Sequence, residues 1–130
     1  MILALRTDKP TAELYLLDDT GNELANHAWE AHRELSQTIL LNINNLLAQN
    51  DKTLQDVGGL VVFNGSGSFT GLRIGIAVAN GLADSLGIPI VSTDTSIWLE
   101  DGCKLLSESK NEHIVQPRYE SPARVTKQKK

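Results

Sequence analysis

The sequence predicts an α/β domain with a mixed sheet and the element order βββαβαβα. Three observations lead to this prediction. Three short strand-like segments with tight connections open the chain, and a stretch with the apolar spacing of a helix follows them. An apolar run bounded by glycines, a second helix and another short apolar run come next, which is the pattern of a right-handed parallel crossover.

The first three strands are expected to form an antiparallel meander. Residues 1–7 (MILALRT) and 11–18 (TAELYLLD) are joined by the short turn DKP. A second turn, DTGN at 19–22, leads into the third segment, ELANHAWE at 23–30. Connections of this length join neighbouring strands that run in opposite directions.

A helix is predicted over about 34–49, because apolar residues recur there at helical spacing. The recurring residues are Leu35, Ile39, Ile43, Leu46 and Leu47. Leu40 and Leu41 widen the apolar face.

The parallel part begins with GLVVFN at 59–64, a continuous apolar run that suits a strand buried on both faces. A helix over 69–86 follows, and Gly87 and Pro89 stand where a helix end is expected. Residues 88–92 (IPIVS) then form a further short strand.

A weaker final helix is expected from a cap at 92–94 to about Leu106. We therefore expect a domain over 1–106 and a flexible basic tail over 107–130. By fold-level analogy, the order of the elements is that of the single ribonuclease H-like half-domain from which actin-like ATPases are built in pairs.

The composition is that of one globular domain, with 41% hydrophobic and 22% charged residues in a chain of 130. Residues 117–130 carry a net charge of +4 and the remainder −8, so the body does not attract nucleic acid by itself. The tail could touch RNA, but a solvated end is the simpler interpretation. No apolar stretch approaches the length of a membrane span, and the lone Cys103 favours a cytoplasmic home.

A glycine-rich turn precedes the second helix and could bind an anion through its backbone amides. Its residues are Gly65, Ser66, Gly67 and Ser68. The dinucleotide fingerprint GxGxxG fails because Thr70 stands where the third glycine is required, and the lysine of a P-loop is absent. The simpler interpretation is that the glycines turn the chain and let the helix lie close to the sheet.

Other candidates for chemistry are few. His27 and His32 are five residues apart, which is a poor spacing for metal ligands, and Asp18-Asp19 is most simply turn chemistry. Cys103 has no base nearby in the sequence. We therefore predict no catalytic residue, no metal site and no cofactor.

The helix over 69–86 is apolar nearly all round. Small residues recur every four positions at Gly71, Gly75, Ala79 and Ala83. Two glycines inside a helix cost about 1 kcal/mol each relative to alanine, so close packing against another backbone is needed to explain them. Two interpretations stay open: the helix over 34–49 packs beside it within the domain, or both helices form an interface with another protein or a second copy.

The interface interpretation predicts a set of partner-binding residues on the two helices. They are Leu35, Ile39, Ile43, Leu46, Gly71, Leu72, Arg73, Gly75, Ile76, Ala79 and Ala83.

The segment NGSGSFTGLRIGIAVANGLA at 64–83 resembles the GPGSFTGLRIG-type signature of the TsaB (YeaZ) family, whose members take part in making threonylcarbamoyladenosine on tRNA. The opening MILALRTD, the stretch AHRELSQTIL and the segment IPIVSTDTS also resemble that family, so the similarity covers about residues 1–100. The resemblance implies a catalytically silent subunit. It implies that this subunit pairs through helices of its first half with TsaD, an actin-like subunit, that the ATPase TsaE joins them, and that tRNA is contacted indirectly.

Three departures from the family pattern stand out. The aspartate of the first strand is replaced by Arg6, and the proline of the signature by Ser66. The family has two half-domains, whereas this sequence resembles the first, with 113–124 (HIVQPRYESPAR) resembling the family's final segment. The alternatives to a partner subunit are a nucleotide-binding, ATPase-like enzyme that uses the glycine turn, or a homodimer outside the complex.

Overall fold

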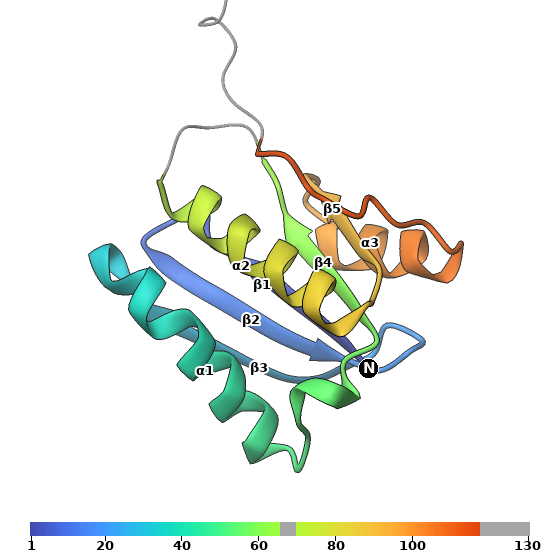
Figure 1. The fold of residues 1–130 in the computed structure, drawn as a ribbon, viewed down its shortest axis with the longest axis horizontal. Coiled ribbons are helices and arrows are strands. Elements are labelled where there is room, and N and C mark those ends of the chain that lie inside the picture. The colour runs from blue at the N-terminus through green and yellow to red at the C-terminus, as the bar shows by residue number, and fades with distance from the viewer. Residues whose placement is uncertain (66–69, 118–130) are drawn as a thin grey trace, which may run out of the picture.

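A five-stranded mixed sheet forms the centre of the computed structural model, which describes residues 1–65 and 70–117 except for the side chain of His32 (Figure 1). The strands lie in the order β3-β2-β1-β4-β5. Their bounds are β1 Ile2–Arg6, β2 Thr11–Leu17, β3 Glu23–Glu30, β4 Gly59–Phe63 and β5 Ile90–Thr93. The first three are antiparallel, and β4 and β5 extend the sheet in parallel with β1. The predicted fold class and the predicted element order, with an antiparallel meander followed by a parallel extension, are confirmed.

The helices cover both faces of the sheet. Their bounds are α1 Leu35–Gln49, α2 Thr70–Leu86 and α3 Trp98–Ser107, with short 3₁₀ turns η1 at His32–Glu34 and η2 at Leu54–Asp56. Figure 1 shows α1 and α2 side by side over one face, with α3 behind the sheet. Two separate hydrophobic clusters follow from this arrangement, one on each face.

The alternation of side chains along β1 divides the core. Leu3 and Leu5 point into the larger cluster beneath α1 and α2, whereas Ile2 and Ala4 point into the smaller cluster beneath α3. All four side chains are buried, because β1 is a central strand paired on both sides. This explains why the opening segment is a continuous apolar run.

Glycines let two helices lie close to the sheet. A Cβ atom on Gly75 of α2 would lie 2.1 Å from Oγ1 of Thr7, and one on Gly102 of α3 would lie 2.3 Å from Cγ1 of Val61. Both distances are shorter than atoms of these types tolerate. Gly75 of α2 therefore packs against the end of β1 in this chain's own sheet.

The segment after α3 differs from the predicted tail. Residues 111–116, which we call the strap, run back along the domain to the carboxyl end of β4 (Figure 1). Val115 of the strap is only 1% exposed and joins the larger hydrophobic cluster. The strap has one buried apolar side chain, so it gives no periodic signal in the sequence. The strap therefore packs on the domain, whereas the sequence predicts a tail from residue 107.

Candidate partner-binding surface

The residues predicted to bind a partner lie, with one exception, inside the domain. Arg73 is exposed. The ten that are buried are Leu35, Ile39, Ile43, Leu46, Gly71, Leu72, Gly75, Ile76, Ala79 and Ala83. They pack between α1, α2 and the sheet, so they are unavailable to another protein while the fold is intact. The open alternative, in which the two helices pack beside each other within the domain, is what the structure adopts.

The physical reason for this error lies in α2. A helix that is apolar nearly all round does not reveal which side faces the sheet. The interface interpretation places the stripe of small residues on the outside of α2, whereas Gly75 faces Thr7 at the end of β1. The side chains that remain on the outside of α2 are on the opposite side of the helix.

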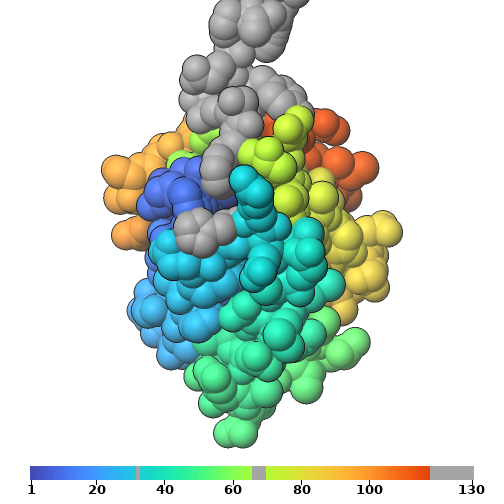
Figure 2. Space-filling view, turned by 90° about the vertical axis from the view of Figure 1, so that its left-hand side faces the viewer, coloured from blue at the N-terminus to red at the C-terminus, as the bar shows by residue number. Residues whose placement is uncertain are grey.

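A smaller apolar surface remains on the outside of the two helices. Leu40 and Leu41 of α1 are 46% and 59% exposed, and Ala77 of α2 is also exposed. Ile74 and Val78 of α2 are half-buried against the core. We call these five residues the outer face; Figure 2 looks at the side of the molecule on which α1 and α2 lie next to each other.

Polar residues surround the outer face. Gln37 and Asn44 are exposed on α1, and Arg73 and Asp84 are exposed on α2. Apolar residues in the middle and polar residues around them are the usual composition of an interface that forms between proteins which are also stable separately.

The carboxyl end of β1 carries Arg6, whose surroundings neutralise its charge. Its Nε donates a hydrogen bond to Oδ1 of Asp8 at 2.8 Å, and its guanidinium carbon lies 3.8 Å from the centre of the Phe63 ring. A guanidinium that stacks on a ring and pairs with a carboxylate already has its interaction partners within the domain. This arrangement places no carboxylate that is free to hold a metal ion at the end of β1.

Of the four residues in the predicted anion-binding turn, the structure describes Gly65. Gly65 lies against Phe63, since a Cβ atom on it would be 2.7 Å from Cε2 of that ring. Ser66, Gly67 and Ser68 lie outside the described residues, so their role stays a prediction. Gly65 itself has a structural reason to be glycine.

His27 and Cys103 have structural surroundings. Nε2 of His27 lies 2.9 Å from Oδ1 of Asn42, and its ring stacks on Trp29, which ties β3 to α1. Burial raises the pKa of the Cys103 thiol, with Glu100 and then Asp18 acting in the same direction, so this thiol is a poor nucleophile.

Among the described residues there is no group of three or more His, Cys, Asp or Glu side chains that could hold a metal ion. None of the described helices has the length and apolarity needed to cross a membrane.

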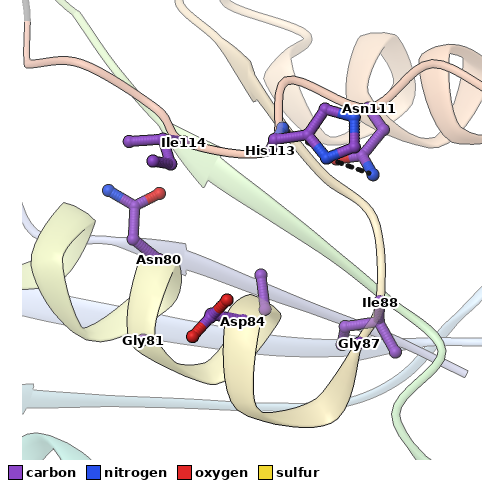
Figure 3. Close-up of a pocket in the computed structure, with 9 residues that line it drawn as sticks. Asn80, Gly81, Asp84, Gly87, Ile88, Asn111, His113 and Ile114 are labelled. Atoms are coloured by element: carbon purple, nitrogen blue, oxygen red, sulfur yellow. Dashed lines mark hydrogen bonds between the residues drawn. The ribbon is translucent and has the colours of Figure 1, made fainter.

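A hollow of about 700 Å³ lies between α2 and the strap (Figure 3). Asn80 and Asp84 of α2 line one side, and Asn111, His113 and Ile114 line the other. It is wide open, and no acid, base and nucleophile meet in it at hydrogen-bond distance.

The fold and its surface define the class: a half-domain of the kind found in actin-like ATPases, with a small apolar face on two packed helices. The family model described as "TsaD: tRNA N6-adenosine threonylcarbamoyltransferase" matches residues 27–112. Comparison with curated proteins found the tRNA threonylcarbamoyladenosine biosynthesis protein TsaB of Escherichia coli (strain K12). It is 35% identical over 101 residues, which make up 78% of this chain and 43% of the relative. TsaB of Bacillus subtilis (strain 168) is 38% identical over 68% of this chain and 38% of the relative.

Solved structures agree with the sequences. "YeaZ from Pseudomonas aeruginosa" has a TM-score of 0.64 and 32% identity, and covers 72% of this chain and 43% of the solved chain. The chain therefore belongs to the TsaB (YeaZ) family, within the larger group that the TsaD model describes. It spans less than half of the length of these relatives.

Proposed function

We propose that the protein is a non-catalytic partner subunit in the synthesis of threonylcarbamoyladenosine on tRNA, and that its outer face binds the TsaD-type subunit. One observation carries the proposal beyond family membership. Leu40 and Leu41 are 46% and 59% exposed on a helix whose remaining leucines are buried, and that helix packs beside α2. Adjacent exposed apolar side chains of this kind are a common feature of surfaces that another protein covers.

The size of the outer face limits what it can do alone. Burying the exposed parts of Leu40 and Leu41 contributes on the order of 1 kcal/mol each. Stable interfaces cover about 800 Å² on each partner, which is more than five side chains provide. The contact must therefore extend over the surrounding polar residues, of which Arg73 is the charged member nearest the amino end of α2.

The surroundings of Arg6 at the carboxyl end of β1 support a non-catalytic role. In a two-lobed nucleotide site, charged groups at this edge must be free to meet phosphate or a metal ion, whereas Arg6 is occupied by Asp8 and Phe63. We propose that any ATPase activity in the complex belongs to another subunit, such as TsaE, and that tRNA is bound by the partner. A homodimer through the same face is the competing assembly.

Size-exclusion chromatography with light scattering tests the proposal. The full chain is measured alone and with the TsaD-type subunit from the same source. We expect a new species with the mass of one chain of each, formed at micromolar concentration. A chain that stays separate from that subunit, or one that forms a homodimer that the subunit cannot dissociate, would refute the proposal.

Calorimetric titration with ATP and Mg²⁺ tests the nucleotide-binding alternative separately. We expect no heat of binding at micromolar concentration. Micromolar binding that Gly67→Val abolishes would favour the enzyme instead.

A further inference from the structure

The strap completes the edge of the sheet as a sixth strand would. At this edge Ile90 donates its backbone N–H to Oδ1 of Asn111 at 3.1 Å, and its carbonyl accepts the N–H of Glu112 at 2.8 Å. The Glu112 carboxylate accepts the backbone N–H of Ser92 at 2.5 Å. Two strap residues thus occupy the outer hydrogen-bonding groups of β5, which an extended peptide uses when it binds a sheet edge.

Two asparagine side chains hold the other half of the strap. Nδ2 of Asn80 donates to the carbonyl of Val115 at 3.0 Å, and Oδ1 of Asn80 accepts the N–H of Val115 at 2.8 Å. Nδ2 of Asn64 donates to the carbonyl of Gln116 at 2.8 Å. The side-chain amide of Asn80 therefore replaces the backbone of a neighbouring strand, and Val115 fills an apolar socket between these amides.

The strap is attached far more lightly than the core strands. Val115 is its only buried side chain, and its other residues are exposed, including Ile114. The hollow between α2 and the strap leaves the strap open to solvent along its side (Figure 3). Ser109, just before the strap, and His113 within it have φ values of 62° and 64°, a region that non-glycine residues enter at a cost.

We propose that the groove formed by the outer edge of β5, Asn80 and Asn64 is a peptide-binding site that this chain fills with its own strap. Its ligand is an extended segment with a β-branched apolar residue, held by backbone hydrogen bonds on both sides of that residue. The occupant in trans is the strap of a second copy. Because that strap is chemically identical, an exchange between two chains restores every contact named above.

This inference is independent of the proposed function. The outer face lies on the exposed sides of α1 and α2, whereas the groove uses the β5 edge and Asn80, which Figure 3 shows opposite the strap. Loss of one interaction would leave the other intact, so the two can fail separately.

The test uses full-length chains and a fluorescent peptide with the sequence of residues 111–117 (NEHIVQP). In the unaltered chain the tethered strap competes with the peptide, whereas Val115→Asp removes its anchor. We expect the peptide to bind the Val115→Asp chain at least about tenfold more tightly than the unaltered chain. A peptide with aspartate in place of the valine should not bind, and adding Asn80→Leu to the variant should weaken binding about tenfold or more.

A second measurement on the unaltered chain removes any dependence on how the variant folds. In amide hydrogen exchange, the N–H groups of Glu112 and Val115 should exchange together and faster than those of Leu60 and Val62 in β4. If the strap exchanges only with β4, or if a folded Val115→Asp chain binds no peptide, the groove is not a separable site.

The second copy is tested by light scattering at high concentration. A fraction of dimer that disappears in Val115→Asp is expected. If no dimer forms, or if a dimer persists in that variant, the assignment of the trans occupant is wrong.

Discussion

Gly75 of α2 lies so close to Thr7 that a Cβ atom on the glycine would be 2.1 Å from the threonine Oγ1. The same hydroxyl donates a hydrogen bond to the carbonyl oxygen of Gly71 at 2.8 Å and is buried. Thr7 therefore fixes the distance of α2 from the end of β1 and its rotation about its own axis. This contact directs the small residues of α2 inward and leaves Ala77 outside.

The first prediction concerns this contact. Gly75→Ala should destabilise the domain by about 2 kcal/mol, because the clash with Thr7 and the loss of its hydrogen bond outweigh a gain of about 1 kcal/mol in helix propensity. Urea unfolding followed by circular dichroism measures the difference.

Gly81→Ala on the same helix is the matched control. A Cβ atom on Gly81 meets nothing within 4 Å, so this change should stabilise the protein by about 0.5–1 kcal/mol. Equal effects of the two substitutions would mean that Thr7 does not set the position of α2.

The second prediction is a high pKa for Tyr15. Burial, followed by the hydrogen bond from its hydroxyl to Oε1 of Glu13 at 2.6 Å, raises the pKa of Tyr15 to about 12. The neutral phenol is favoured in the folded state. Its contribution to stability is therefore complete below pH 10 and is lost as the pH rises through about 12.

The pKa of Tyr15 is measured by following the NMR chemical shift of its Cζ carbon as the pH is raised. Glu13→Gln should lower the pKa of Tyr15 only part of the way towards 10, because burial is the larger cause. A Tyr15 that titrates near 10 in the unaltered protein would show that the ring is more hydrated than the structure indicates.

The third prediction concerns the turn between β2 and β3. Oδ1 of Asp18 accepts the backbone N–H of Asn22 at 2.9 Å and the hydroxyl of Thr20 at 2.8 Å. These bonds, with that from the Asn22 backbone first, lower the pKa of Asp18 to about 2. The charged form is favoured in the folded state, so its contribution is present above pH 3.8 and is lost as the pH falls through about 2.

Removing the Thr20 hydroxyl separates its effect on the pKa of Asp18 from that of the Asn22 backbone. Thr20→Val should raise the pKa of Asp18 measured by carboxyl NMR, yet leave it below 3.8, because the Asn22 backbone still donates. A titration of Asp18 that is the same with and without the Thr20 hydroxyl would contradict the proposed geometry.

The fold could be predicted from the sequence because its signals are local. Apolar runs, turn residues and helical spacing specify β1 to β5 and the helices within a few residues of their observed bounds. The strap could not be predicted in this way. Its bonds to Asn64 and Asn80 join residues 52 and 35 positions apart, and its one anchor, Val115, has no periodic neighbours.

The candidate site was harder to predict than the fold. In α1, the leucines that recur at helical spacing are buried, and the two that only widened the apolar face, Leu40 and Leu41, are the exposed ones. Helix α1 has more apolar residues than one side of a helix can bury. This excess was the signal in the sequence for the outer face. In α2, composition alone does not distinguish a side that faces the sheet from one that faces a partner, because only the contact with Thr7 decides it.

The central claim is that the outer face binds the TsaD-type subunit, and isothermal titration calorimetry with a matched pair of charge substitutions tests it most directly. Leu41→Glu places a charge on the outer face, whereas Ile97→Glu changes a residue of similar exposure, 52% against 59%, before α3 on the other side of the sheet. Both chains should keep the unfolding free energy of the unaltered protein within about 0.5 kcal/mol. We expect Leu41→Glu to weaken binding at least about thirtyfold and Ile97→Glu to leave it unchanged. Unchanged binding by Leu41→Glu, or equal losses in both variants, would contradict the account.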